Sequence, residues 1–508
     1  MTLSDAAAWP REAGLASEAL AQLDRPIEPV PVAPLYRLGL AVVAVLMVVL
    51  PLVYVGLIGL VGYLLYQHIA YDTVVFEEVK SARAAFVLYV APIVVGGLLL
   101  LFMVKPLFAR RARPPALLAL DPASQPLLFE FVNRLCAAVG APRPREINVD
   151  CEVNASASLR RGLWSLIGND LRLTIGLPLA AGLTLRQFVG VLAHEFGHFA
   201  QGSALRLTYI IRAVNAWLAR VVYERDAWDE RLAAWSQEGG WITLVLWVAR
   251  AFIWITRRNL WCLMWVGHLV SCFMLRQMEF DADRYEARVA GSGNFAQTCR
   301  RLPVLGVGAQ NAFVDLDTAW REGRLCDDLP ALMLANANQL TAEQLERIEQ
   351  MVSQTRTGFF DTHPADADRI ASAAAENAAG IFTADGPATA LFRDFAGLCK
   401  SATAHHYRKV VGVEVSDEQL VPTRQVVEGV NRVWKHVRRS QRNPQGGRVH
   451  KEMPIHLSNV QLICPACGAA TRTGARIEPD GGKVRFCKKC KAAIGRIAPP
   501  KAKQAKNA

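Results

Sequence analysis

The sequence predicts a mainly α-helical protein with a small β-sheet, an N-terminal transmembrane helical hairpin and a small C-terminal β module. Three observations lead to this fold class: two long apolar runs near the start of the chain, a helix-forming stretch with two histidines four residues apart, and two pairs of closely spaced cysteines near the end. A chain of 508 residues is long enough for two or more domains.

The two apolar runs, residues 38–66 and 84–104, contain no charged residue. Each is long enough for the roughly 20 residues that a helix needs to cross a bilayer. We therefore expect a transmembrane hairpin in residues 35–113 rather than two buried helices of a globular core. Lysine and arginine follow the second run, so the positive-inside tendency places both chain ends and the downstream domain in the cytoplasm.

Two other regions are harder to interpret. Residues 1–34 are rich in alanine, end in a proline-rich run and lack the pattern of a signal peptide, so we expect an exposed leader. Residues 241–275 hold two further apolar runs of about 16 residues, which are marginal for crossing a bilayer. Arg257 and Arg258 separate these runs. Short membrane spans, re-entrant or interfacial helices, and core helices of the downstream domain all fit this pattern.

A strand, a turn and a helix are predicted between residues 171 and 203. Thr184 and Gln187 form a capping-box pattern at the start of the helix. The helix contains HEFGH, which puts His194 and His198 on one face, where two imidazoles can bind one Zn²⁺. Glu195 stands beside the first histidine, placed to take a proton from metal-bound water. We expect a catalytic zinc here rather than a chance pattern in an ordinary helix.

Two histidines leave a catalytic zinc one protein ligand short. Glu279 and Asp283, in MEFDADRYEA, share a helical face at a spacing of four. One carboxylate can ligate zinc while the other holds the free ring nitrogen of a ligating histidine. By spacing alone, however, such acidic pairs are more often part of a solvated helix surface.

The stretch VLAHEFGHFAQG followed by MEFDADRYEA resembles the family of membrane zinc metallopeptidases that contains HtpX and the CAAX prenyl proteases. The resemblance covers roughly residues 35–375 and implies a zincin-like metallopeptidase domain, which we place at 114–437. It also implies that Glu279 is the third zinc ligand and that Asp283 holds a ligating histidine.

Two further stretches resemble elements of this family. VNASASLRRG is similar to the family's Asn-Ala strand at the edge of the cleft, so Asn154 and Ala155 are candidate substrate contacts through strand addition. DTHPADADRI is similar to its Thr-His-Pro element. The resemblance suggests His363 as a transition-state or substrate contact and Arg369 as an ion-pair partner, although a lone histidine in such a loop is more often structural.

The C-terminal cysteine pairs, CPAC and CKKC, have the spacing of a closed Cys₄ structural zinc site. We expect a zinc ribbon at residues 459–496, after a linker at 438–458 and before a basic tail at 497–508. Seven other cysteines are scattered singly, which favours reduced thiols in a cytosolic domain. The predicted structural zinc ligands are Cys464, Cys467, Cys487 and Cys490.

The positive net charge of +12 is concentrated at the C-terminus. Residues 431–508 contain 18 basic and 3 acidic residues, against 39 and 42 in the rest of the chain. A solvated tail and a surface for anionic lipid, nucleic acid or protein all fit this distribution.

Together these patterns predict a membrane-anchored zinc metalloendopeptidase that cleaves protein or peptide substrates and carries one catalytic and one structural zinc. Resemblance to HtpX implies membrane protein quality control in a multi-pass protein of the bacterial inner membrane. Two alternatives stay open: a processing protease of narrow specificity, and a membrane-tethered adaptor that acts through its zinc ribbon.

Overall fold

The structure, a computed structural model, divides the chain into two compact units, Met1–Thr423 and Arg424–Ala508. Each unit is described by itself. The described residues are 14, 17–31, 33–108, 117–160, 170–200, 203–224, 242–321, 323–416, 419–421, 423, 432–437, 447–452, 462–464, 466–467, 469–479 and 483–498.

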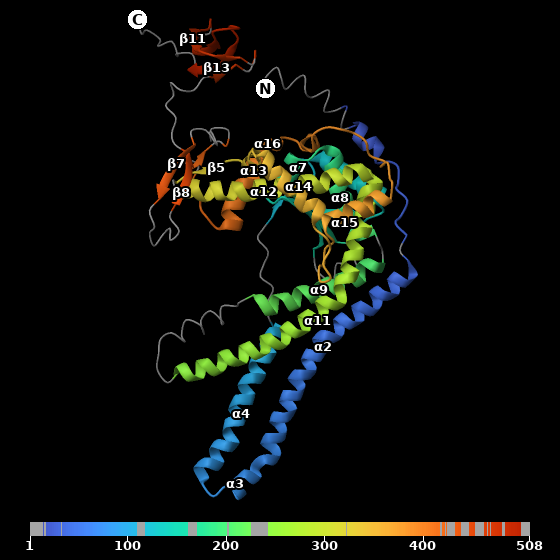
Figure 1. Ribbon diagram of the computed structural model, residues 1–508, viewed down its shortest axis with the longest axis vertical. Helices are drawn as coiled ribbons and strands as arrows, with labels where there is room; N and C mark the ends of the chain where they lie inside the picture. Colours follow the sequence, from blue (N-terminus) through green and yellow to red (C-terminus); the bar gives the residue numbers. More distant parts are fainter. Residues whose placement is uncertain are drawn as a thin grey trace, which may run out of the picture. The chain divides into compact units, whose positions relative to one another are not determined.

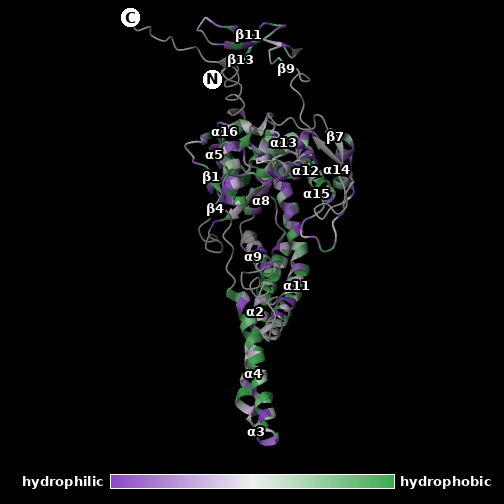
Figure 2. Cartoon of the chain, turned by 90° about the vertical axis from the view of Figure 1, so that its left-hand side faces the viewer, coloured by the Kyte–Doolittle hydropathy of each residue, from purple (hydrophilic) through white to green (hydrophobic). Residues whose placement is uncertain are grey.

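The first unit contains two long apolar helices, α2 (Pro34–Tyr71) and α4 (Ala82–Val104), which pack side by side (Figure 1). Among the described residues, two helical segments are long and apolar enough to cross a membrane, and these are the two helices with the short turns that extend them. Most of their large apolar side chains are exposed, and Figure 2 shows both helices as largely hydrophobic. The prediction of two long apolar helices is confirmed. The arginines at 110, 111 and 113 lie outside the described residues.

A four-stranded sheet forms in the order β1-β2-β4-β3. Strands β2 and β4 are parallel, and the two outer strands pair antiparallel with them. The apolar residues of β4 are fully buried, which explains why this run of branched side chains forms an inner strand. Strand β3 lies at the edge of the sheet. The strands are β1 (Leu118–Ala119), β2 (Pro144–Asp150), β3 (Ala155–Leu159) and β4 (Leu171–Gly176).

The chain leaves β4 through a short helix, α7 (Leu177–Gly182), and enters α8 (Leu185–Ala200). The strand predicted at the start of residues 171–203 ends at Gly176, because Pro178 suits the first turn of a helix. The predicted capping box is confirmed: Gln187 N donates to Thr184 Oγ1 at 3.2 Å, and Thr184 N donates to Gln187 Oε1 at 3.1 Å.

One helix, α11 (Ile242–Ala290), runs through the region that we expected to contain two separate apolar segments. It is continuous because neither glycine nor proline interrupts the chain at Arg257 and Arg258, and arginine is a good helix former. The N-terminal part of α11 packs against α2 and α9 (Ser203–Tyr223), whereas its C-terminal turns join the main core. Among the described residues, α11 is not one of the two candidate membrane spans.

The remaining elements of the first unit are short helical turns at the ends of α2 and α4, further helices of the main core and a small two-stranded sheet. They are η1 (Asp72–Val74), α3 (Val75–Glu78), η2 (Lys105–Phe108), α5 (Pro126–Val139), α12 (Ser292–Arg321), β5 (Leu325–Cys326), α13 (Leu329–Asn338), α14 (Ala342–Gln354), α15 (Asp366–Ala375), η4 (Ala388–Leu391), α16 (Phe395–His405), η5 (His406–Val411) and β6 (Leu420–Val421).

The N-terminal segment differs from the exposed leader that we expected. Between residues 17 and 31, four apolar side chains are buried in the main core. Arg288 of α11 donates to the carbonyls of Glu28 and Pro29, and Gln22 Oε1 accepts hydrogen bonds from the backbone of Thr383 and Ala384. The proline-rich composition suggested exposure, but apolar residues three or four positions apart pack into the core. The buried side chains are Ala19, Leu23, Ile27 and Val30.

The second unit consists of β-strands. A hairpin of β7 and β8 is followed by the pair β9 and β10 and by the antiparallel sheet β11-β12-β13. Strand β8 falls within residues 438–458, where we expected a linker. The strands are β7 (Arg432–Val437), β8 (Gly447–Glu452), β9 (Leu462–Ile463), β10 (Ala470–Thr471), β11 (Thr473–Ile477), β12 (Lys483–Cys487) and β13 (Ala493–Ala498).

Candidate metal centres

Helices α8 and α11 bring three predicted ligands together. His194 Nε2 lies 3.6 Å from Glu279 Oε2, and His198 Nε2 lies 3.8 Å from Glu279 Oε1. All three residues are buried, and their ligand atoms lie within 4.8 Å of one another. Two imidazole nitrogens and one carboxylate oxygen therefore converge on a single point.

The close approach of the two helices depends on glycine. A Cβ added to Gly197 would lie 2.9 Å from the ring of Tyr285, and one added to Gly190 would lie 3.0 Å from Glu286 Oε1. Both glycines belong to α8, and both contacts are made by α11. Without these side chains the helices pack closely enough for residues on α8 and α11 to share one ligand cluster.

A second carboxylate orients the first histidine. Asp283 Oδ1 lies 3.0 Å from His194 Nδ1, on the side of the ring away from Glu279. Arg369 of α15 binds Asp283 through both carboxylate oxygens, with N–O distances of 3.0 and 2.6 Å. Asp283 is fully buried. The chain of contacts from Arg369 to Asp283 to His194 fixes the ring, as in metal sites whose ligating histidines are held by a carboxylate.

The charges in this cluster shift the pKa values of its members. Burial alone would raise the pKa of Glu279, but hydrogen bonds with His194 and His363 hold it well below its usual range. Burial lowers the pKa of His194, but hydrogen bonds with Asp283 and Glu279 raise it overall to about 10. Burial and the nearby charge of His194 lower the pKa of His198 to about 3. At neutral pH these shifts favour a proton on His194, held between Asp283 and Glu279, and a neutral His198.

These residues fit a zinc ion. Two histidines and a glutamate form the ligand set of many catalytic zinc sites, which leave one position for water. Ligands about 2.0–2.1 Å from a tetrahedral metal lie about 3.3 Å apart, so the observed 3.6 and 3.8 Å require only a small closing movement. A metal ion bound here competes with the proton on His194, because ligating histidine is neutral.

Glu195 lies next to the cluster and contacts the edge strand. Its Oε2 accepts a hydrogen bond from Ala157 N of β3 at 3.2 Å. Burial raises the pKa of Glu195, while the charge of His194 and this hydrogen bond oppose the increase. A carboxylate whose pKa is raised toward neutrality is suited to accept and return a proton.

The other predicted site residues lie at varying distances from the cluster. His363 Nδ1 lies 3.6 Å from Glu279 Oε1, and its side chain is 72% exposed, so a substrate can reach it. Arg369 pairs with Asp283. Asn154 and Ala155 stand at the start of β3, where Ala155 is buried against the core and Asn154 O accepts a hydrogen bond from Gly176 N.

Three residues near the cluster were missed in the sequence. Arg212 of α9 donates to Glu279 Oε1 at 3.0 Å, and Glu286 of α11 is buried within reach of His194 and Asp283. Burial raises the pKa of Glu286 to about 8. Ala157 contacts Glu195 through its backbone only, which no residue pattern reveals. A charged residue within an otherwise apolar helical face could have pointed to Arg212 and Glu286.

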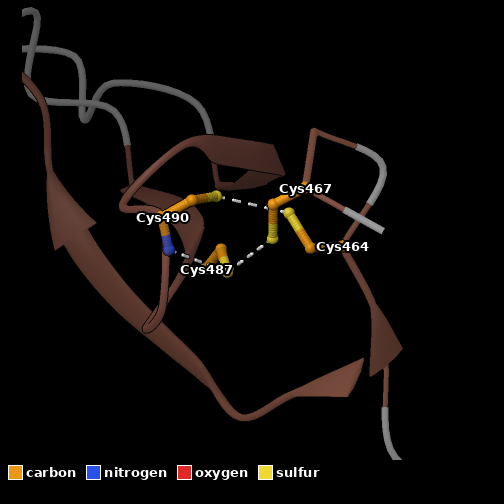
Figure 3. A group of neighbouring side chains, drawn as sticks. All are labelled: Cys464, Cys467, Cys487 and Cys490. Atoms are coloured by element: carbon orange, nitrogen blue, oxygen red, sulfur yellow. Dashed lines mark hydrogen bonds between the residues drawn. The ribbon is translucent and has the colours of Figure 1, made fainter. Parts of the chain in front are cut away.

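The second unit contains a separate cluster of four cysteines. Figure 3 shows their side chains pointing toward one another. The Sγ atoms of Cys464 and Cys490 are 3.5 Å apart, and those of Cys467 and Cys487 are 4.0 Å apart. The backbone N–H of Cys490 points to the Cys487 sulfur and lowers the pKa of that thiol to about 6.

This cluster also fits a zinc ion. Four thiolates at about 2.3 Å from a tetrahedral zinc lie about 3.8 Å apart, and the two observed distances lie on either side of that value. All four positions are filled by sulfur, so the site is closed to a substrate. The other seven cysteines are free thiols.

Comparison with known families gives two matches in different parts of the chain. The model of peptidase family M48 matches residues 122–377. The model of the C-terminal domain of large ribosomal subunit protein uL24 matches residues 430–494. No solved structure matches the chain.

Similar curated proteins cover the C-terminal region. The chain is 49% identical over 100 residues to large ribosomal subunit protein uL24 of Rhodopirellula baltica, which is 20% of this chain and 83% of that protein. It is 52% identical over 80 residues to uL24 of Carboxydothermus hydrogenoformans, 15% of this chain and 75% of that protein. It is 55% identical over 67 residues to uL24 of Halothermothrix orenii, which is 13% of this chain and 64% of that protein.

These matches correct our identification of the C-terminal module. We expected a zinc ribbon at residues 459–496, whereas the matching domain is that of uL24 and begins at residue 430. The cysteine spacing indicates a metal-binding fold but does not distinguish between families that share it. The strands before the cysteines belong to the same match.

Proposed function

Because the chain belongs to peptidase family M48, a family of zinc metallopeptidases, we propose that it is an endopeptidase whose reaction centre is the cluster of His194, His198 and Glu279. The convergence of these ligands beside Glu195 is the observation that carries the proposal. Zinc, when bound, polarises the scissile carbonyl and makes a water molecule more acidic.

The residues of the chain have separate parts in this reaction. Glu195 accepts a proton from the attacking water and delivers it to the leaving amine. Asp283 and Arg369 keep His194 in one orientation. His363, exposed beside Glu279, contacts the substrate or the developing negative charge.

Strand β3 offers a way to hold the substrate. It forms the edge of the sheet, and its Ala157 N–H points to Glu195. An extended peptide that adds to this edge uses backbone hydrogen bonds, which do not depend on side-chain identity. Asn154 and Ala155, at the start of the strand, take part in the same edge.

We also propose that α2 and α4 anchor the protein in a membrane. Their length, apolar composition and exposed apolar side chains support this. The resemblance to HtpX supports a multi-pass protein of the bacterial inner membrane, with the peptidase domain in the cytoplasm and a part in membrane protein quality control. A processing protease of narrow specificity is the enzymatic alternative.

Cleavage of casein and of a model membrane protein by the purified, detergent-solubilised chain tests the activity. We expect cleavage that a chelator stops and that zinc restores. Proteolysis that persists both with chelator and in Glu195→Gln would exclude the proposed centre.

The C-terminal unit supports a second function: binding to the large ribosomal subunit. The 49% identity to a uL24 protein, over 83% of its length, favours this function over lipid binding. The exposed basic side chains of the C-terminal unit can neutralise RNA phosphates. In this function the C-terminal unit would bind the partner, and the rest of the chain would tether it to the membrane. In the described part of the unit the exposed basic side chains are Arg472, Arg476, Lys483, Arg485, Lys488, Lys489 and Lys491.

Sedimentation with purified large ribosomal subunits tests this second function. We expect the full chain to co-sediment at low salt and to dissociate as salt rises, because phosphate contacts weaken with salt. Replacement of Lys483, Arg485 and Lys489 by glutamate should abolish co-sedimentation, whereas Glu195→Gln should not affect it. Binding that persists in the triple variant would argue against an RNA-binding surface on these strands.

A further inference from the structure

A groove of about 500 Å³ lies between α9 and α11, and the proposed ligand Glu279 forms part of its wall. The two helices run antiparallel along it: Arg212 of α9 contacts Glu279, and Asn215, less than one turn further along α9, contacts Ser271 of α11. From Glu279 the groove reaches back along α11 to Met264. At 1.5 Å per residue this is about 22 Å.

Three of the polar side chains in the groove are already bound within the protein. Arg212 Nη2 donates to Glu279 at 3.0 Å, Asn215 Nδ2 donates to Ser271 Oγ at 2.9 Å, and His268 Nε2 lies 2.6 Å from the carbonyl oxygen of Phe360. A polar ligand would have to break these contacts, which costs free energy when the groups are left without a partner.

Apolar side chains form most of the remaining wall. Ala219 lies on the α9 side, and Met264, Trp265 and Leu275 lie on the α11 side. Trp265 also packs edge-on against Phe360, with ring centroids 6.0 Å apart, at the loop before His363. Apolar atoms therefore form the larger part of the wall that a bound group meets.

The loop beside the groove is held in place. Arg276 Nη1 donates to the carbonyl oxygens of Gly358, Phe359 and Asp361, at 3.2, 2.8 and 2.9 Å. One guanidinium thus fixes the turn that carries Phe360 and leads to His363. The groove has a preformed wall on this side, which favours selection by shape.

We propose that this groove binds the substrate residues beside the scissile bond, in extended form, and selects a bulky apolar side chain. The inference rests on the proposed peptidase function. A lysine or arginine side chain would meet the positive charge of Arg212, and an aspartate or glutamate would meet Glu279 and compete for Arg212. An apolar side chain meets neither penalty.

The groove cannot enclose a helical substrate. A helix about 10 Å wide and 22 Å long occupies roughly 1,700 Å³, so a groove of about 500 Å³ can hold only one of its faces. Addition to the edge strand β3 requires an extended backbone, so an apolar helix, such as a membrane span, must unwind locally before it is cleaved. The preferred substrates are unfolded chains and frayed ends of apolar helices.

A panel of fluorogenic peptides tests the inference. The peptides differ only at the residues flanking the scissile bond, which are leucine, phenylalanine, glycine, aspartate or lysine. We expect kcat/KM to be at least about ten-fold higher for leucine and phenylalanine than for aspartate and lysine. Equal cleavage of all peptides, or a preference for a charged residue, would overturn the inference.

Two variants locate the selectivity in the groove. Ala219→Trp fills the groove and should lower kcat/KM for the phenylalanine peptide about ten-fold or more, with little change for the glycine peptide. Ala219→Leu serves as the test if the tryptophan variant folds poorly, and it should lower kcat/KM for the phenylalanine peptide in the same direction but by less. Ala251→Trp places the same side chain on an exposed position of α11 outside the groove and should change neither.

The outcomes separate this inference from the proposed function. If the wild-type chain cleaves no peptide or protein, the peptidase function fails and the inference fails with it. If cleavage depends on zinc and Glu195 but Ala219→Trp and Ala219→Leu affect the glycine and phenylalanine peptides equally, the peptidase stands and the groove is not its selective site.

Discussion

The two candidate metal centres are built on different scales. The four cysteines of the second unit lie within 26 positions of one another, at the ends of short strands. The histidines and Glu279 come from two long helices, and the arginine that holds Asp283 lies 86 positions further along the chain. One cluster needs only a local turn at each pair, whereas the other needs the packing of three helices.

This difference predicts different uses of a metal ion. A closed set of thiolates adds folding free energy to a small unit that has little apolar core of its own. An open set of three ligands, with Glu195 beside it, contributes to chemistry and depends on a core that is stable without the ion. The two ions should therefore be separable by mutation.

The largest effect is expected from removing the thiolates. Cys464→Ser with Cys467→Ser should reduce bound zinc from about two ions per chain to about one. It should also unfold the second unit, because an ion bound by all four thiolates would join its strands. Limited proteolysis and metal analysis check this. Peptidase activity should be largely retained, and loss of both ions together would show that the centres are not independent.

Glu195→Gln should have the next largest effect. The amide cannot accept the proton of the attacking water, so kcat should fall by about 10²–10⁴-fold while both zinc ions remain bound. Fluorogenic peptide kinetics and metal analysis measure the two quantities. Glu346→Gln, on the exposed face of α14, serves as a matched control and should keep full activity.

Asp283→Asn should have an intermediate effect. It weakens the contact that orients His194 and leaves Arg369 with only its longer contact to Asp366, at 3.8 Å, so zinc affinity or activity should fall by about 10–100-fold. Titration with a competing chelator measures the affinity. The cysteine-bound ion should be unaffected, and equal weakening of both ions would contradict a local role for Asp283.

The smallest effect is expected in the stability of the first unit at acidic pH. Burial raises the pKa of Glu376, but Arg284 and Arg288 of α11 lower it overall below its ordinary value of 4.5. Since the folded pKa is lowered, this stabilisation is present at neutral pH and is lost as the pH falls below about 4.5 toward the folded pKa.

Glu376→Gln should therefore cost about 1 kcal/mol at pH 7 and nothing once the pH is below the pKa of the folded state. Thermal melts of the solubilised chain at pH 7 and at pH 3 compare the two conditions. The variant should melt earlier at pH 7 by a few degrees or less. A difference that grows as the pH falls would have the wrong sign for this ion pair.

Local patterns in the sequence predicted the elements whose interactions are local. The capping box of Thr184 and Gln187, the face shared by His194 and His198, and the two long apolar helices all depend on residues close in sequence. Glu279 joins the cluster as expected, but its assignment needed a family resemblance, since a spacing of four is common on solvated helices.

The misses involve contacts that a local pattern does not contain. Arg212 meets Glu279 across 67 positions. The continuity of α11 was missed because the two arginines divide the apolar pattern, although Arg257 and Arg258 are good helix formers and do not end a helix. The uL24 domain was seen only as paired cysteines, because the sequences of strands β7 and β8 lack the paired spacing that marks the cysteines.

The buried N-terminal segment has a consequence for the order in which the protein is made. Gln22 leaves the ribosome early, but the backbone groups that it binds belong to Thr383 and Ala384, 361 and 362 positions later. At about 5–20 residues per second, this partner appears roughly 20–70 s after Gln22. Over that interval the apolar residues of the segment have no completed core to enter. The segment of residues 17–31 is therefore synthesised well before its partners, and it can close this part of the core only when Thr383 and Ala384 have been made.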